Sequence, residues 1–136
     1  MEMDIHYDSN IEVITEEDLQ ALFLSVEWES GKHPNELLQA IAGSHSIVVA
    51  WDGDKLVGLV NALSDGVLTV YFHYMLIHPH YQKEGIGKKL MDIMLDKYKG
   101  CKTKVLISYD DAIDFYQKCG FSEEDGVTPM FISQLV

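Results

Sequence analysis

Basic residues are scarce in this sequence, and their scarcity excludes one broad class of function. The 136 residues include 10 lysines and arginines against 22 aspartates and glutamates, which gives a formal net charge of −12. Such a chain repels the phosphates of nucleic acids, and no basic stripe compensates for this repulsion. We therefore expect no nucleic-acid partner, whereas amines and other cations would be attracted towards a cleft.

Cysteines and long apolar runs are also few. Cys101 and Cys119 allow at most one disulfide, which a chain of this size and hydrophobic content does not need, so free thiols are expected. No apolar run approaches the roughly 20 residues of a membrane span. The acidic N-terminus lacks the basic residues of a signal peptide. These absences predict a soluble, cytoplasmic protein without membrane association.

Length and composition favour a single domain over residues 1–136. A hydrophobic content of 47% with 24% charged residues is ordinary for a globular protein. A chain of this length can bury one substantial core but hardly two. The sequence also shows no internal repeat and no low-complexity run, so an extended or disordered architecture is not indicated.

Hydrophobic periodicity predicts the element order β-α-α-β-β-β-α-β-α-β. A capping box at Thr15–Asp18 opens a first helix that runs to about Trp28, and Pro34 starts the second. The expected strands are Met3–Tyr7, Ser46–Trp51, Lys55–Leu63, Val67–Ile77, Thr103–Ser108 and Met130–Leu135. Later helices are expected after Gly85 and over Ala112–Cys119. The predicted fold class is α/β (α+β), with a mixed, mostly antiparallel central sheet of about six to seven strands and helices on both faces.

A glycine-bearing bend at residues 81–88 joins the long strand ending at Ile77 to the next helix. The first amides of a helix have no carbonyl partner inside it and carry partial positive charge, so such an end attracts anions. Two common phosphate loops are excluded by spacing. A Walker loop would need glycine at Gln82 and serine or threonine at Lys89, and a dinucleotide fingerprint would need glycine at Leu90.

The remaining pattern, Gln-x-x-Gly-x-Gly from Gln82 to Gly87, resembles the acetyl-CoA loop of the GNAT superfamily of N-acetyltransferases. A second motif, Ala-x-x-Phe-Tyr-x-x-x-Gly-Phe from Ala112 to Phe121, is common in the same superfamily at this distance after the loop. Within it, the chain is most similar to plastid and cyanobacterial serotonin N-acetyltransferases, on the basis of Trp28, residues 62–66 and residues 125–131. This resemblance implies acetyl-CoA as the acyl donor and a primary amine as the acceptor.

The resemblance also implies where acetyl-CoA binds. The pantetheine arm would lie along the main chain of Met75, Leu76 and Ile77, and an N–H of Leu76 or Ile77 would polarise the thioester carbonyl. The diphosphate would rest on the amides of Gln82, Lys83, Glu84, Gly85, Ile86, Gly87 and Lys88. Tyr109 stands where the family often has an asparagine near the arm, and it keeps one hydrogen-bond donor.

Two candidate catalytic residues follow from the same resemblance. Tyr116 occupies the position of the acid that protonates the leaving thiolate. Tyr74 replaces an aspartate that close relatives often carry, so His73 is the candidate base, acting through water. Strand alternation predicts that His73 and Tyr74 lie on opposite faces. Loss of the amine proton to water, without a dedicated base, remains an alternative.

The resemblance also implies that Trp28, Glu27 and Tyr74 border the acceptor site, where acidic and aromatic groups would suit an amine with an apolar body. The predicted activity is N-acetyltransfer by direct attack in a ternary complex. Alternatives are a non-catalytic acyl-CoA-binding module and an interaction protein that retains only the fold. No metal is expected, because His78 and His80 lack a third ligand. The oligomeric state is left open, a homodimer included.

Overall fold

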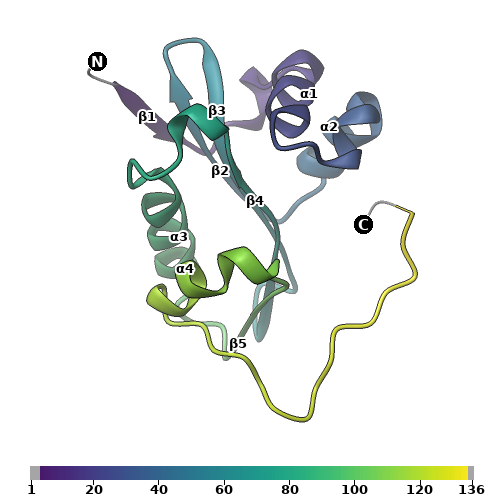
Figure 1. Ribbon diagram of the computed structural model, residues 1–136, viewed down its shortest axis with the longest axis vertical. Helices are drawn as coiled ribbons and strands as arrows, with labels where there is room; N and C mark the ends of the chain where they lie inside the picture. The colour runs from purple at the N-terminus through teal and green to yellow at the C-terminus, as the bar shows by residue number, and fades with distance from the viewer. Residues whose placement is uncertain (1–3, 135–136) are drawn as a thin grey trace.

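The computed structural model describes residues 4–134, which contain one five-stranded sheet (Figure 1). In sheet order the strands are β1 (Ile5–Asp8), β2 (Ser46–Asp52), β3 (Lys55–Ser64), β4 (Thr69–Ile77) and β5 (Thr103–Leu106). Strands β1 to β4 pair antiparallel, and β5 pairs parallel with β4. The predicted mixed, mostly antiparallel sheet is confirmed, although the described residues form fewer strands than the sequence predicted.

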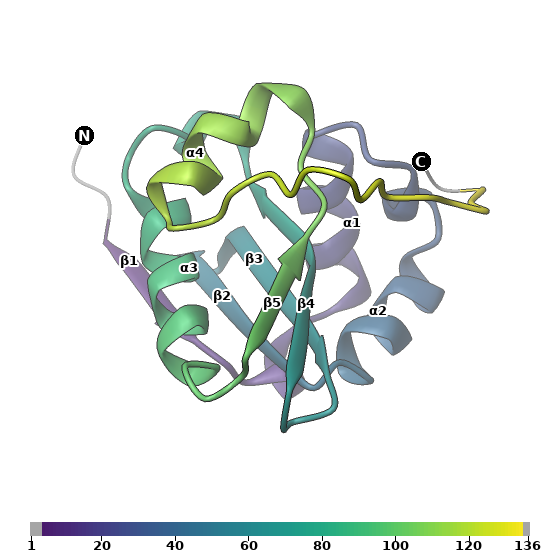
Figure 2. The same cartoon turned by 90° about the horizontal axis from the view of Figure 1, so that it is seen from below.

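Helices cover both faces of the sheet, as predicted. Helices α1 (Glu16–Ser25) and α2 (Pro34–Ala42) lie on one face, and α3 (Ile86–Lys97) and α4 (Ile113–Lys118) lie on the other (Figures 1 and 2). Short 3₁₀ turns connect the elements: η1 (Ile11–Val13), η2 (Glu29–Lys32), η3 (Pro79–Tyr81) and η4 (Asp110–Ala112). The sheet therefore separates two helical layers, and a ligand between β4 and β5 could contact both.

The predicted start of the first helix is confirmed. The Thr15 hydroxyl accepts a bond from the Asp18 N–H at 3.1 Å, and the Asp18 carboxylate accepts one from the Thr15 N–H at 3.0 Å. This reciprocal capping box satisfies two donors that the first helical turn leaves without partners. Pro34 occupies the first turn of α2, where its missing N–H costs nothing.

The end of the first helix differs from the prediction. Helix α1 stops at Ser25 and not near Trp28, because Glu27 adopts a left-handed conformation with φ 60°. The Trp28 N–H then bonds to the Phe23 carbonyl (3.1 Å), and the Glu27 N–H bonds to the Leu24 carbonyl (3.0 Å), which closes the helix as a Schellman motif. The chain turns directly into η2, which brings Trp28 towards the sheet.

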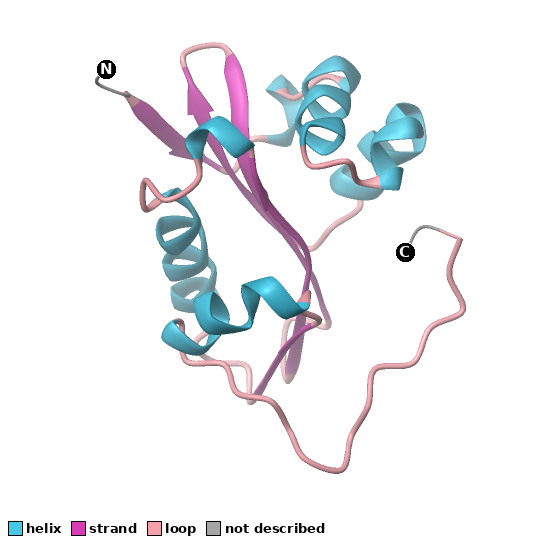
Figure 3. Cartoon of the chain, viewed as in Figure 1, coloured by secondary structure: helices cyan, strands magenta, loops and turns pink. Residues whose placement is uncertain are grey.

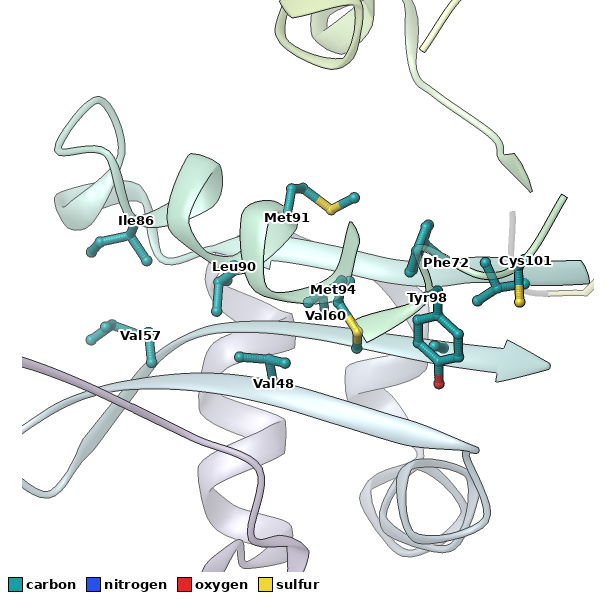
Figure 4. Close-up of a cluster of buried hydrophobic side chains, with 13 residues drawn as sticks. Val48, Val57, Val60, Phe72, Ile86, Leu90, Met91, Met94, Tyr98 and Cys101 are labelled. Carbon is teal, nitrogen blue, oxygen red and sulfur yellow. The ribbon is translucent and has the colours of Figure 1, made fainter. Parts of the chain in front are cut away.

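The hydrophobic core lies in two halves on either side of the sheet. Figure 4 shows the half under α3, where Leu90 and Met94 pack onto Val48 and Val60 of the strands. A Cβ on Gly58 would lie 2.9 Å from Ile77 Cδ1 and 3.3 Å from Leu90 Cδ1. The absence of a side chain at this position lets α3 approach the sheet closely. The second half lies beneath α1 and α2.

Strand β5 ends part-way along β4. Their pairing runs only from Thr69 opposite Thr103 to Phe72 opposite Leu106. The rest of β4, residues 73–77, pairs with β3 on one side and, within the described part of the chain, with no strand on the other. We call this unpaired side of β4, along residues 73–77, the gap.

The predicted last strand, Met130–Leu135, does not form in the described residues. Residues 122–134 contain no helix or strand and run away from the sheet as an extended segment (Figure 3); Leu135 lies outside the described residues. The apolar side chains of this segment are exposed: Val127, Met130, Phe131 and Ile132. The prediction was wrong because β-propensity does not form a strand unless a sheet edge lies beside it.

Candidate active site

The N-terminus of α3 presents main-chain donors to open space. Gly85 is the N-cap residue with φ 84°, and no side chain caps the helix. The first intrahelical bond joins the Lys89 N–H to the Gly85 carbonyl (3.1 Å). The N–H groups of Ile86, Gly87 and Lys88 therefore have no partner inside the helix. A Cβ on Gly85 would meet no atom within 4 Å, so an anion can approach these donors closely.

The loop before α3 is tied to the sheet by two side chains. Gln82 donates from Nε2 to the Ile77 carbonyl at 3.1 Å, and the Tyr81 hydroxyl donates to the Asp52 carboxylate at 2.5 Å. Lys83 adopts a left-handed conformation, with φ 66°, which strains a residue that has a Cβ. These contacts hold the open helix end in a fixed position relative to β4.

The charged side chains of this loop are exposed. Lys88 bonds through Nζ to the Asp92 carboxylate at 2.6 Å, and this hydrogen bond raises the pKa of Lys88. Lys83 and Glu84 are exposed at the tip of the bend. Lys88 is therefore already paired with Asp92, whereas the first main-chain N–H groups of α3 have no partner inside the helix.

Gly87 has a packing role in addition to the predicted one. A Cβ at Gly87 would lie 3.0 Å from Met75 Cε and 3.2 Å from Phe115 Cζ. The first turn of α3 therefore touches β4 and α4 at once, which a larger residue would prevent. Sequence analysis assigned both glycines to phosphate approach, but the open space lies at Gly85.

The amides of β4 alternate between β3 and the gap. The His78 N–H donates to the Val57 carbonyl on β3 at 2.8 Å. Because alternate N–H groups of a strand point in opposite directions, the Leu76 N–H also points to β3. The N–H groups of Met75 and Ile77 point to the gap, the side of β4 that has no strand of residues 4–134 beside it after β5 ends. Of the two predicted carbonyl donors, only Ile77 faces the gap.

A β-bulge places His73 and Tyr74 on the same face. Both residues lie opposite the single residue Asn61, where the register of β3 and β4 shifts. Their rings stack with centroids 4.1 Å apart and an interplanar angle of 23°. The predicted opposite orientation of these two side chains is wrong, because the extra residue of the bulge shifts the alternation by one.

An aromatic row extends from the bulge towards the segment after β5. The Tyr74 ring packs edge-on against Phe23, with centroids 4.9 Å apart, and its hydroxyl lies 2.7 Å from the Ser30 hydroxyl. Trp28 lies 6.1 Å from Tyr74 and also 6.1 Å from Tyr109, between ring centroids. Tyr109, predicted beside the pantetheine arm, therefore lines the same wall as the predicted acceptor residues.

Two carboxylates flank Trp28. Glu29 pairs with Lys32 at 3.2 Å, whereas Glu27 is exposed and forms no ion pair within residues 4–134. Glu27 therefore leaves one uncompensated negative charge at the end of the aromatic row, where a cation would be attracted.

Tyr116 lies on the opposite face of the sheet, in α4. Its ring packs against Phe115 and Phe121, with centroids 5.1 Å and 6.1 Å away. Burial, and secondarily the charge of Cys119, raise the pKa of Tyr116 to about 12. Its hydroxyl has no hydrogen-bond partner among the described residues. At neutral pH this hydroxyl is therefore protonated and free to donate.

The pKa of His73 is lowered, whereas that of Tyr116 is raised. The His73 residue is partly open to solvent, but one face of its ring lies on Tyr74. The resulting desolvation lowers the pKa of His73 below its ordinary value of 6.5. The imidazole is therefore neutral at pH 7 and can accept a proton. A protonated Tyr116 hydroxyl and a neutral His73 imidazole therefore lie on opposite faces of the sheet.

Comparison with known proteins identifies the family. Residues 43–123 match the family model described as an acetyltransferase (GNAT) domain. The chain belongs to the GNAT family of acetyltransferases. The match spans β2 to α4, and so includes the bulge, the open end of α3 and Tyr116.

Several GNAT proteins resemble nearly the whole chain. It is 31% identical to the "Uncharacterized N-acetyltransferase ycf52" of Porphyra purpurea, over 92% of this chain and 75% of that protein. A ycf52-like protein of Prochlorococcus marinus is 33% identical over 79% of this chain and 62% of its own length. The structure of the GNAT family acetyltransferase SP0256 of Streptococcus pneumoniae TIGR4 superposes with a TM-score of 0.82 at 29% identity, covering 96% and 99% of the two chains.

These relatives establish the GNAT fold and the acetyltransferase class but name no acceptor. The closer similarity to serotonin N-acetyltransferases is therefore not confirmed. Residues 4–134 contain no group of three His, Cys, Asp or Glu side chains suited to a metal ion. They also contain no helix with the length and apolar character to cross a bilayer.

Sequence analysis missed two residues of the site, Ser30 and Asn61. Both are buried and both bond to Tyr74. A signal was present for Asn61, because it is the one amide side chain in the otherwise apolar run from Leu56 to Leu63. A polar group in a buried strand requires a partner and so marks a place where main-chain pairing changes.

We predict that His73 titrates below its ordinary pKa of about 6.5. In NMR titrations its ring midpoint should lie below that value, with the resonance assigned by its loss in His73→Gln. Because the unfolded chain then takes up the proton first, the stability gained from neutral His73 is complete above about pH 6.5 and falls as the pH drops through the folded pKa. A midpoint at or above 6.5 would contradict the desolvation at Tyr74.

Proposed function

We propose that this protein transfers an acetyl group from acetyl-CoA to a primary amine by direct attack in a ternary complex. The observation that carries the proposal is the uncapped N-terminus of α3, placed at the end of a strand whose outward amides have lost their neighbour. One end of this arrangement suits a diphosphate, and the other suits the acyl end of the same molecule.

The residues present fit acetyl-CoA. Amides of Gln82, Lys83, Glu84, Gly85, Ile86, Gly87 and Lys88 would hold the diphosphate, and Met75 and Ile77 offer main-chain groups along the gap. Gly85 leaves space for close approach. Bound acetyl-CoA would supply an acetyl group activated as a thioester.

The Ile77 N–H is our candidate for polarising the acyl carbonyl. It points into the gap, whereas the Leu76 N–H points to β3. A fixed main-chain dipole stabilises developing negative charge without reorganising at the moment of reaction. This role needs no particular side chain, so the sequence alone leaves both amides open.

Tyr116 is our candidate proton donor to the departing thiolate. Its hydroxyl is protonated at neutral pH, unpaired among the described residues and on the α3 side of the sheet. A thiol with a pKa of about 8.5 is a tolerable leaving group even without help, so the contribution of Tyr116 should be moderate.

His73 is our candidate base, acting through water. An alkyl amine with a pKa of about 10.4 is almost entirely charged at pH 7, so removing its proton costs more than protonating the thiolate. Neutral His73, beside Tyr74 on the α1 face, can accept such a proton. Direct loss of the proton to solvent remains the alternative without a dedicated base.

The acceptor would lie along the aromatic row. Trp28, Tyr74 and Tyr109 provide apolar ring surface, and Glu27 provides negative charge beside it. These features favour an amine with an apolar body, and a small amine and a lysine side chain both meet this description. An arylalkylamine such as serotonin is one candidate within this class.

Other features of the proposal depend on the sequence prediction. They are one domain over residues 1–136, a cytoplasmic location and an oligomeric state that the sequence leaves open, a homodimer included. An acyl-CoA-binding module without catalysis is the competing function, and no comparison supports it. The two differ in one measurement: acceptor-dependent release of CoA from acetyl-CoA, tested with a panel of amines and lysine peptides.

Tyr116→Phe should lower turnover by about ten- to a thousandfold while leaving the affinity for acetyl-CoA nearly unchanged. The ring keeps its contacts with Phe115 and Phe121, so the variant removes only the hydroxyl. Tyr7→Phe, on β1 at the other end of the sheet from β5, is the matched control and should retain turnover. Steady-state kinetics of CoA release would measure both, and normal turnover in Tyr116→Phe would refute the assignment.

Gly85→Asp should weaken acetyl-CoA binding by about tenfold or more, because it places a carboxylate beside the diphosphate donors. Gly126→Asp is a matched control. Gly85 and Gly126 have φ values of 84° and 85°, and a Cβ at either meets no atom within 4 Å. Both variants thus carry the same backbone strain and the same added charge, but only Gly85→Asp lies at the loop before α3. Equal affinities by isothermal titration calorimetry would show that the diphosphate binds elsewhere.

A further inference from the structure

Two polar side chains are buried within the described core, and both bond to Tyr74. Ser30 is 7% exposed and Asn61 is 1% exposed. The Ser30 hydroxyl lies 2.7 Å from the Tyr74 hydroxyl, and Asn61 Oδ1 accepts the Tyr74 N–H at 2.7 Å. Buried polar groups are uncommon unless they have a specific partner. Their convergence on one residue indicates that the conformation of Tyr74 is closely fixed.

Asn61 replaces the carbonyl that the bulge removes. Where His73 and Tyr74 oppose one residue, the ladder of main-chain bonds is interrupted. The Tyr74 N–H would otherwise be buried without an acceptor, which is unfavourable. The Asn61 amide is itself held, because Nδ2 donates to the Ser44 hydroxyl at 3.0 Å and that hydroxyl donates to the Ala40 carbonyl at 3.0 Å. The bulge is thereby connected to the end of α2.

The bulge determines which groups face the gap. With regular alternation, His73 and Tyr74 would lie on opposite faces, and one half of β4 would shift its register by one residue. Such a shift would turn different amides towards β3 and different amides towards the gap. The direction of the Ile77 N–H and the direction of the His73 ring thus depend on the same extra residue in β4.

We propose that Asn61 is a positioning residue, which keeps the bulge in β4 and so sets both the carbonyl-polarising amide and the His73–Tyr74 pair. This inference rests on the proposed acetyl transfer. Asn61 touches neither substrate nor donor in this role and acts through the main chain of Tyr74.

The decisive variant is Asn61→Leu, which keeps the side-chain size and removes the acceptor. We expect turnover to fall by about ten- to a thousandfold and the KM for acetyl-CoA to rise by less, because the gap amides shift while the diphosphate donors at the N-terminus of α3 remain. NMR cross-peaks between the His73 and Tyr74 rings should disappear. Asn61→Asp keeps an oxygen at the acceptor position and should restore the cross-peaks and much of the turnover.

Leu59→Ala is the control for destabilisation, because Leu59 is fully buried on the same strand and makes no bond to the bulge. It should keep the cross-peaks and the turnover per folded molecule. If Asn61→Leu does not fold, Ser44→Ala tests the same idea, since it releases Asn61 from α2 and should weaken the cross-peaks. Unchanged cross-peaks and turnover in Asn61→Leu would overturn the proposal. If only Ser44→Ala folds, the same result in that variant would overturn it. If the wild-type protein transfers no acetyl group but Asn61→Leu still loses the cross-peaks, the proposed function is rejected and the positioning role is supported.

A separate observation concerns the outer edge of β5 and the C-terminal segment, residues 122–134. Strand β5 is the last of the sheet, and Val105 on it is 40% exposed. In the C-terminal segment Met130 is 90% exposed and Ile132 is 107% exposed. Figure 1 shows the segment looping away from the body of its own chain. An unpaired edge and an extended apolar segment are the two halves of a strand-addition contact.

We infer that the C-terminal segment of one copy adds to the outer edge of β5 of a second copy, in a reciprocal exchange. Two-fold symmetry lets each copy supply one segment and one edge. Charge agrees with this contact, because Lys102 precedes β5, Lys104 lies within it, and the segment carries Glu123, Glu124 and Asp125 near its start.

Ile132→Glu tests the exchange without affecting the core, because this side chain contacts nothing that a charge would disrupt within its own chain. Sedimentation over a concentration series should show a dimer of the 15.4 kDa chain, with a dissociation constant raised by about tenfold or more in Ile132→Glu. Val67→Glu, at an exposed position in the β3–β4 turn, should leave the dimer intact. The inference would be overturned if the wild-type protein stayed monomeric at every concentration. It would also be overturned if Ile132→Glu left the dimer unaffected.

Discussion

The hydrogen bond from the Tyr74 N–H to the Asn61 side chain is the constraint on which the geometry of the site depends. A bulge leaves main-chain groups without partners, and a buried N–H without an acceptor would favour regular pairing. The Asn61 amide removes this disadvantage, so the extra residue in β4 is retained. After the bulge, the side chains and N–H groups of β4 are shifted by one residue in their alternation relative to β3. The position of one side-chain oxygen on β3 therefore governs groups at some distance along the neighbouring strand.

The open end of α3 is coupled to the same strand. Gln82 bonds to the Ile77 carbonyl, and Gly87 allows the first turn of α3 to contact Met75. A molecule held by the helix amides at one end would therefore meet the gap amides of β4 at a fixed distance and orientation. Preorganisation of this kind reduces the entropy that binding and reaction would otherwise cost. The two sets of N–H groups would act as one site in the proposed function, because the loop between them is short and bonds to the sheet through Tyr81 and Gln82.

Local signals in the sequence predicted most of the fold. The capping box at Thr15, Pro34 and the glycine before α3 each act within a few residues, so their effects can be recognised without a structure. The position of Tyr116 and of the α3 loop came from motifs that keep a fixed order and spacing. What could not be predicted depends on contacts between distant residues. The bulge needs Asn61 opposite His73, α1 ends early because Glu27 adopts a left-handed conformation, and residues 130–134 form no strand without an edge beside them.

Charge explains why the site uses the main chain. All ten basic residues are lysines, and the formal net charge is −12, so the field of the whole protein opposes a polyanionic ligand. Lys88, the lysine in the first turn of α3, is already paired with Asp92. Main-chain N–H groups at a helix end are polar but uncharged, and they bind an anion at short range without altering this field. The same negative field favours a cationic amine at the aromatic row. One charge distribution can therefore serve two substrates of opposite sign, because the anion is recognised by local dipoles and the cation by the overall potential.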